Sequence, residues 1–307
     1  MRGLASRSLP LRLTALHTRR DAPGLMNEAT VRVPATTANL GPGYDALGVA
    51  LQIENRVTVR RDAPVHEHAM SAEVAAKFFP ASGVTPFEFD WSITGEVPRA
   101  RGMGSSVTVR LGLLHGLNEL ADRPLGAQRL FELCAQLEGH PDNAAPAAFG
   151  GFTVAGGAEV ARFPVAPRLR FILLIPDFEI ATPDARRVLP PQIDRLGAAR
   201  SCANACRITA AFASQDYALL RGAFEDHLHQ PYRERALIPF LSAVIAAGER
   251  AGALGGFLSG SGSTICCVAE GNEEEIGAAM LSASGNAGAR VVITTGDNEG
   301  VKIVGCS

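Results

Sequence analysis

The fold of this chain is decided by the stretch Pro98-Arg99-Ala100-Arg101-Gly102-Met103-Gly104-Ser105-Ser106. It is followed by a run, Val107 to Leu120, in which leucines recur at helical spacing, and Ser105 or Ser106 would suit the N-cap of that helix. Glycines let the backbone approach a ligand closely, and the first N–H groups of a helix are unpaired at the positive end of its dipole. The stretch predicts a phosphate-binding loop, although an ordinary capped helix after a loop explains the same pattern equally well.

The overall composition bounds the kind of protein. With 307 residues, 47% of them hydrophobic, the chain is long enough for one large domain or two ordinary ones. The 29 basic and 31 acidic residues nearly balance, which disfavours nucleic acid or an anionic membrane as a partner. No apolar run approaches the roughly 20 residues that span a bilayer.

Lysine is almost absent, and this limits how phosphate could be bound. Only Lys77 and Lys302 occur, and neither follows the glycine-rich stretch. A loop of the form G-x-x-x-x-G-K-[ST] is therefore excluded. If phosphate binds here, backbone N–H groups, hydroxyls, arginine and a metal ion must hold it.

The cysteines and the N-terminal segment bear on the cellular compartment of the protein and on where its fold begins. None of the cysteines shows zinc-ligand spacing, so we expect reduced thiols in a cytoplasmic protein; they are Cys134, Cys202, Cys206, Cys266, Cys267 and Cys306. Residues 1–29 are rich in arginine with no acid before Asp21, as in a transit peptide. A mis-assigned start codon or a disordered tail explains them as well, and we exclude them from the fold.

The hydrophobic pattern predicts an α+β fold in two layers, with helices on one face of each sheet. Strands are expected at 31–33, 50–60, 87–93, 150–154, 170–176, 265–268, 290–294 and 301–304, and helices at 107–120, 125–138, 196–220, 238–251 and 273–284. The sequence pattern changes around Pro164 to Pro167, which marks a candidate domain boundary. We therefore expect one domain over 30–164 and a second over 165–307.

A second glycine-rich segment, Pro34 to Asp45, follows the first strand. Its spacing Gly41-x-Gly43-x-x-Ala46 superficially matches a dinucleotide-binding fingerprint, but no helical period follows it. The other interpretation is a substrate loop in which glycines hold out Asp45 to receive a cation or a hydroxyl.

Carboxylates and arginines supply the remaining candidates. Glu132 leaves the buried face of its expected helix, and Mg²⁺ prefers one or two carboxylates together with phosphate oxygens. A solvated helix face is the simpler explanation. The polar turn 140–143 likewise fits ordinary turn chemistry. Two arginines from distant segments, one of the pair Arg186 and Arg187 and one of the pair Arg233 and Arg235, could bind one carboxylate, although most arginines are surface charges.

Together these motifs resemble the GHMP small-molecule kinases. The stretch 98–106 is similar to their phosphate-binding signature, with Met103 where leucine is usual, and Leu258 to Thr264 resembles their third motif. Three further segments resemble motifs of the branch of the family that phosphorylates homoserine: Val33 to Gly48, His140 to Pro146 and Pro231 to Arg233. Departures from the family pattern occur at Tyr44, Val107, Thr108 and Ser263.

The resemblance implies a two-domain architecture, with an N-terminal domain like that of ribosomal protein S5 and a C-terminal ferredoxin-like domain. It also implies Mg²⁺- and ATP-dependent phosphorylation of the L-homoserine side-chain hydroxyl, a step toward threonine. ATP would be bound by Pro98, Arg99, Ala100, Arg101, Gly102, Met103, Gly104, Ser105 and Ser106. The metal would be held by Ser106 and Glu132, and the substrate by Asn39, Asp45, His140, Asn143, Thr182, Arg186 and Arg233. Ser106, Glu132 and Asn143 would be the catalytic residues.

An amide such as Asn143 cannot accept a proton at neutral pH, so we expect catalysis by positioning and Mg²⁺, without a strong general base. A homodimer is compatible with the resemblance. Three alternatives stay open. The first is another GHMP kinase, whose substrate is an isoprenoid precursor, a sugar or a shikimate-like acid. The second is a non-catalytic ligand sensor of the same fold, and the third is a dinucleotide enzyme.

Overall fold

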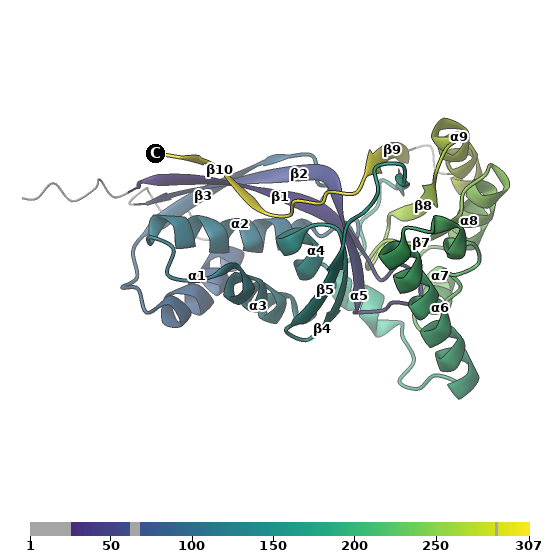
Figure 1. The fold of residues 1–307 in the computed structure, drawn as a ribbon, viewed down its shortest axis with the longest axis horizontal. Helices are drawn as coiled ribbons and strands as arrows, with labels where there is room; N and C mark the ends of the chain where they lie inside the picture. Colours follow the sequence, from purple (N-terminus) through teal and green to yellow (C-terminus); the bar gives the residue numbers. More distant parts are fainter. Residues whose placement is uncertain (1–25, 62–67, 286–287) are drawn as a thin grey trace, which may run out of the picture.

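Two antiparallel sheets, each with its own helices, organise the molecule into two lobes (Figure 1). The computed structural model describes residues 26–61, 68–285 and 288–307. The expectations for most of the segment 1–29 lie outside the described residues. In the described ranges, no helix is long and apolar enough to cross a bilayer.

The first lobe is a six-stranded sheet of order β10-β1-β2-β4-β5, with β3 paired to β2. Its strands are β1 (Glu28–Ala38), β2 (Leu47–Arg61), β3 (Phe89–Gly95), β4 (Phe152–Gly156), β5 (Glu159–Phe163) and β10 (Lys302–Cys306). The helices α1 (Ala69–Ser82), α2 (Ser105–Leu120), α3 (Ala127–Glu138) and α4 (Ala144–Phe149) lie on one face of it (Figure 1).

Helix α2 lies against strands β1 and β2 because its sequence leaves room for them. A Cβ atom on Gly112 would lie 2.5 Å from Val57, and one on Gly116 would lie 2.4 Å from Val59. The two valines are fully buried, as alternation along β2 predicts for its helix-covered face. This close packing fixes where the N-terminus of α2 points.

The second lobe is a four-stranded sheet of order β7-β8-β6-β9. Its elements are β6 (Arg170–Ile175), α5 (Thr182–Arg187), α6 (Arg195–Ser214), the 3₁₀ turn η1 (Tyr217–Leu220), α7 (Gln230–Ala236), α8 (Leu241–Arg250), β7 (Gly255–Leu258), β8 (Ile265–Ala269), α9 (Glu273–Ser284) and β9 (Arg290–Thr295).

The second sheet is covered on both faces, not on one as expected. Ile172 and Leu174 of β6 belong to the core with α8 and α9, while Phe171 and Leu173 belong to a core that includes α6. That second core also takes in residues of β2 and β4, and Phe152 of β4 stacks on Phe212 of α6 with ring centroids 4.2 Å apart. The apolar run in β6 therefore indicates burial on both sides, and the two lobes share one core.

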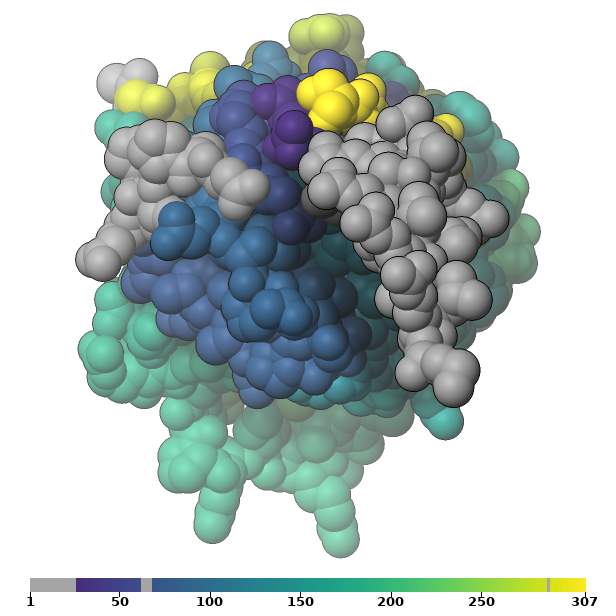
Figure 2. All heavy atoms as spheres, turned by 90° about the vertical axis from the view of Figure 1, so that its left-hand side faces the viewer, coloured from purple at the N-terminus to yellow at the C-terminus, as the bar shows by residue number. Residues whose placement is uncertain are grey.

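The chain returns to the first lobe after completing the second. Strand β10 pairs with β1, and Figure 2 shows the C-terminal residues beside the start of β1. Arg32 of β1 binds the carboxylates of Glu54 and Asp297 and donates to the carbonyl oxygen of Gly300 at 3.2 Å. The expected unit 165–307 thus contains one strand of the first sheet.

Several local expectations need correction. The pattern did not predict α1, α5, α7, β5 or β7, and at 140–146 it indicates only a turn or a helix start, where α4 begins at Ala144. The expected helix 196–220 ends at Ser214 because Gln215 is left-handed, with φ of 56°, and Tyr217 turns inward, where its hydroxyl accepts from the Ala166 N–H at 2.9 Å. The segment after Gly43 enters strand β2 directly, so the dinucleotide interpretation, which needs a helix there, is wrong.

Candidate active site

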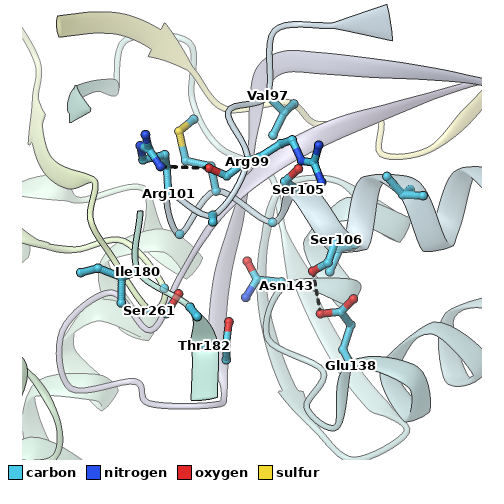
Figure 3. Close-up of a pocket in the computed structure, with 18 of the residues that line it drawn as sticks. Val97, Arg99, Arg101, Ser105, Ser106, Glu138, Asn143, Ile180, Thr182 and Ser261 are labelled. Carbon is cyan, nitrogen blue, oxygen red and sulfur yellow. Dashed lines mark hydrogen bonds between the residues drawn. The ribbon is translucent and has the colours of Figure 1, made fainter. Parts of the chain in front are cut away.

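A cavity of about 860 Å³ opens between the lobes and collects residues from distant parts of the chain (Figure 3). The turn between β1 and β2, the glycine-rich loop before α2 and the turn between α3 and α4 contribute from the first lobe. Helices α5 and α7 and the loop between β7 and β8 contribute from the second.

The glycine-rich loop adopts a backbone that excludes side chains. Gly102 and Gly104 have φ angles of 72° and 68°. A Cβ atom on Gly102 would lie 2.1 Å from the Ser259 carbonyl oxygen, and one on Gly104 would lie 2.2 Å from Thr36 Oγ1. Gly104 itself is the N-cap of α2 with no side-chain cap, so the expectation of a serine N-cap is wrong. The first N–H groups of α2 consequently remain at the cavity wall.

Both lobes hold this loop in place. The carbonyl oxygen of Met103 accepts from the N–H of Thr36 at 3.2 Å, on β1. The carbonyl oxygens of Ala100 and Arg101 accept from the N–H groups of Ile180 and Thr264, at 3.1 and 3.2 Å, in the second lobe. Such anchoring keeps the N–H groups at the start of α2 fixed relative to both halves of the cavity.

At the start of α2, a hydroxyl and a carboxylate face each other. Ser106 Oγ donates to Glu138 Oε2 at 3.0 Å, and Arg110 forms an ion pair with the other oxygen of Glu138 at 2.6 Å. Figure 3 shows Ser106 and Glu138 meeting beside the loop. Hydroxyl and carboxylate oxygens are the hard donors that Mg²⁺ prefers, so this pair fits the metal that the sequence predicts.

The expected metal ligand Glu132 is not at this place, where Glu138 lies instead. Glu132 does not line the cavity; it pairs with Arg129 on its own helix at 2.9 Å. Glu138 is the last residue of α3, next to left-handed Gly139. Six residues along a helix turn the side chain by about 600°, which places the two glutamates on different faces.

An ion pair between the lobes forms a second part of the site. Arg186 of α5 donates to both oxygens of Asp45, at 2.8 and 3.1 Å, and to the Tyr44 hydroxyl at 2.8 Å. Asp45 has a φ of 56°, and its N–H donates to Asn39 Oδ1 at 3.0 Å. Burial lowers the pKa of Arg186, but hydrogen bonds and charge from Asp45 raise it above its ordinary value overall. Arg186 is therefore charged.

Arg233 of α7 is a buried cation, 2% exposed, at the same cavity. Its Nε donates to the Ala185 carbonyl oxygen at 3.1 Å, and its Nη1 donates to the Gly260 carbonyl oxygen at 2.8 Å and to His229 Nδ1 at 3.1 Å. Burial lowers the pKa of His229 to about 4, which keeps this ring neutral and able to accept. Burial also lowers the pKa of Arg233, which makes an anionic ligand beside it favourable.

The turn between α3 and α4 carries a histidine–carboxylate pair. His140 Nδ1 lies 2.6 Å from Asp142 Oδ1, which also accepts from the Asn143 N–H at 2.9 Å. The hydrogen bond to Asp142 raises the pKa of His140 despite partial burial, Asp45 adds to this and Arg186 opposes it. One ligand atom each of Asp45, His140 and Asp142 lies within 4.8 Å of the others.

The raised pKa of His140 makes stability depend on pH. A group whose pKa is higher in the folded state stabilises the fold below its unfolded pKa, and this contribution is lost as pH rises through the folded value. We expect His140→Gln to reduce the free energy of unfolding more at about pH 5.5 than at about pH 9. Urea unfolding of both proteins at the two pH values measures this; an equal reduction at both would contradict it.

The structure brings most of the predicted site residues to one cavity. Its lining includes Asn39, Asp45, Arg99, Ala100, Arg101, Gly102, Met103, Gly104, Ser105, Ser106, His140, Asn143, Thr182, Arg186 and Arg233. Pro98 and Glu132 are not part of the lining.

The sequence did not predict two lining residues, Glu138 and Asp142. Their position in or beside the polar turn 140–143 could have indicated them. Sequence reasoning also missed an apolar end of the cavity, formed by Met70 of α1 and by Trp91, Ile93 and Val97 on and after β3.

Comparisons with known proteins agree with this geometry. The family model "GHMP kinases N terminal domain" matches residues 69–151, and "GHMP kinases C terminal" matches 208–287. The chain is 35% identical over 293 residues to the homoserine kinase of Aquifex aeolicus, covering 89% of this chain and 98% of that protein. It is 37% identical over 290 residues to that of Trichormus variabilis, covering 88% and 96%.

Solved structures show the same likeness. The crystal structure of homoserine kinase from Cytophaga hutchinsonii has a TM-score of 0.82 and 26% identity, covering 91% of this chain and 98% of that one. A mevalonate kinase structure, with a TM-score of 0.64, 12% identity and coverage of 88% and 99%, shares the fold alone. Two lobes around a glycine-rich loop thus define the class as the GHMP kinases. Within that class, the chain belongs to the homoserine kinase family.

Proposed function

We propose that this protein transfers the γ-phosphoryl group of ATP to the side-chain hydroxyl of L-homoserine, giving O-phospho-L-homoserine. The observation that carries the proposal is the meeting of Asp45 and Arg186, as a two-bonded ion pair, in the cavity that also holds Asn143 and the glycine-rich loop. An amino acid with a hydroxyl side chain presents the matching set of groups.

The charged side chains would bind the α-amino and α-carboxylate groups. Asp45 offers an anion to the ammonium, while Arg186 and Arg233 offer two guanidinium groups to the carboxylate. Substrate binding would exchange the Asp45–Arg186 ion pair for new pairs with the ligand, so both charges stay compensated. Asn39, His140 and Thr182 line the same space.

The opposite part of the cavity would bind the nucleotide. The loop 98–106 would wrap the phosphates with its N–H groups, and the apolar end around Trp91 suits a flat base. Ser106 and Glu138 would hold Mg²⁺, which, when bound, neutralises phosphate charge. Arg110 keeps the Glu138 carboxylate oriented toward Ser106.

The chemistry would depend on alignment. The homoserine hydroxyl oxygen forms a bond to the γ-phosphorus as the bond to the β,γ-bridging oxygen breaks, and ADP leaves. Asn143 contacts the attacking hydroxyl but cannot take its proton, which would pass to a phosphoryl oxygen. Positioning and charge stabilisation are the main requirements for such a loose transition state.

A coupled assay of ADP release tests this function. We expect turnover with L-homoserine and Mg²⁺, little with L-serine, whose hydroxyl is one carbon shorter, and none with mevalonate, which lacks the ammonium. Turnover with mevalonate in place of homoserine would assign another GHMP kinase. Binding of ATP and homoserine without turnover would assign a ligand sensor. A cytoplasmic location and a homodimer belong to the same proposal.

A further inference from the structure

We propose that Thr36 is a positioning residue for the transfer: its hydroxyl fixes the direction of the Asn143 amide and links that amide to the glycine-rich loop 98–106, the phosphate loop. This inference rests on the proposed function. Thr36 itself does not line the cavity.

Thr36 lies between the two parts of the site that must be aligned. It is fully buried on β1, and its Oγ1 donates to Asn143 Oδ1 at 2.7 Å. Its N–H donates to the Met103 carbonyl oxygen at 3.2 Å. A Cβ atom on Gly104 would lie 2.2 Å from Thr36 Oγ1 and 3.4 Å from Asn143 Oδ1. The hydroxyl therefore lies directly against the phosphate loop on one side and the amide on the other.

The surroundings allow only one orientation of that amide. Asn143 Nδ2 lies 3.4 Å from Asp142 Oδ1, a carboxylate oxygen that can only accept. The NH₂ end must face Asp142, so the oxygen end faces Thr36, which donates to it. Figure 3 shows the amide projecting into the cavity between the phosphate loop and Thr182.

This orientation decides what Asn143 offers to a substrate. One N–H of the NH₂ group is directed toward Asp142, and the other is available to an acceptor in the cavity. Asn143 would then donate to the attacking hydroxyl oxygen and leave its second lone pair for the phosphorus. Without the Thr36 hydroxyl, the amide oxygen loses its donor and the amide can rotate away from this alignment. The loss should appear in the transfer step and not in binding.

The variant Thr36→Val keeps the shape of the side chain and removes the hydroxyl. We expect its kcat with homoserine to fall by about tenfold, the equivalent of one hydrogen bond, with KM for homoserine and for ATP within about twofold of the wild-type values. Thr36→Ser, which keeps the hydroxyl, should restore most of kcat. If Thr36→Val does not fold, Thr36→Ala serves in its place.

Thr30→Val is the matched control. Thr30 lies on the same strand, and its hydroxyl bonds the Thr58 hydroxyl at 2.9 Å, away from the cavity. The Thr30→Val variant loses the same hydroxyl group as Thr36→Val, and we expect its kcat to stay within about twofold of the wild-type value. Equal losses of kcat in Thr30→Val and Thr36→Val would show a general effect on β1 and overturn the proposal.

A double-mutant cycle separates positioning from mere structure. If Thr36 acts through Asn143, adding Thr36→Val to Asn143→Ala costs no further kcat. Additive losses, an unchanged kcat in Thr36→Val, or failure of Thr36→Ser to restore it would each overturn the inference. Wild-type protein without turnover on homoserine would instead contradict the proposed function. The cycle is then measured with whichever alcohol the wild type phosphorylates.

Discussion

Glu138→Gln is expected to lower kcat/KM for phosphoryl transfer by at least about a hundredfold, the usual cost of removing a charged group that stabilises a transition state. The reason is the pair that Glu138 forms with the Ser106 hydroxyl, 3.0 Å apart at the start of α2. The amide keeps the size of the side chain but removes its negative charge. Steady-state kinetics over a range of Mg²⁺ concentrations measures the loss, which excess Mg²⁺ should partly reverse.

Glu132→Gln is the control for this prediction. Glu132 lies on the same helix, outside the cavity lining, and bonds its helix neighbours Gln128 and Arg129. An exposed pair of this kind contributes little to stability, and we expect kcat/KM to stay near the wild-type value. A loss in Glu132→Gln with full activity in Glu138→Gln would reverse the assignment of the metal ligand.

Gly104→Ala is expected to abolish most activity while the protein still folds. The added Cβ would lie 2.2 Å from Thr36 Oγ1, so the loop must move away from β1. A displacement of about 1 Å at a reacting centre can cost about a hundredfold in rate. We expect kcat/KM to fall by at least that factor, measured in the ADP-release assay beside a urea unfolding curve.

Gly83→Ala separates crowding from backbone strain. Gly83 ends α1 with a φ of 69°, close to the 68° of Gly104, but a Cβ there meets nothing within 4 Å. Both variants should lose about 1–2 kcal/mol of stability because alanine is strained in the left-handed region. Only Gly104→Ala should lose activity. An active Gly104→Ala enzyme would show that the loop tolerates displacement.

Motifs and periodicity predicted the residues that converge on the cavity more reliably than they predicted their contacts. Helical spacing placed Glu132 off the buried face, which is correct, but it could not tell which carboxylate of α3 faces the glycine-rich loop. That depends on how α3 packs against α2, a tertiary relation. The turn residues His140 and Asn143 were assigned to the site through the resemblance of 140–146 to the GHMP kinases, because turn chemistry alone explains the same residues.

The fold shows the same limit. Strong alternation and long apolar faces predicted β3, α2 and α9 with small errors at their ends. Helix α1 escaped because an alanine-rich segment with Pro80 near its end has a weak periodic signal. The sequence did not indicate a role for Thr36, because threonine is common on strands. The role that we propose for Thr36 depends on its hydrogen bond to Asn143, which lies 107 residues away in sequence.

The pairing of β10 with β1 has a consequence for how the molecule is made. On the ribosome, most of the first lobe is synthesised first, yet its sheet lacks the edge strand β10 until the whole second lobe has emerged. The ion pair between Arg32 and Asp297 likewise cannot form until nearly the whole chain has been synthesised. The first sheet can therefore be completed only after the second lobe has been synthesised, so the last step in forming the first lobe depends on the last residues of the chain.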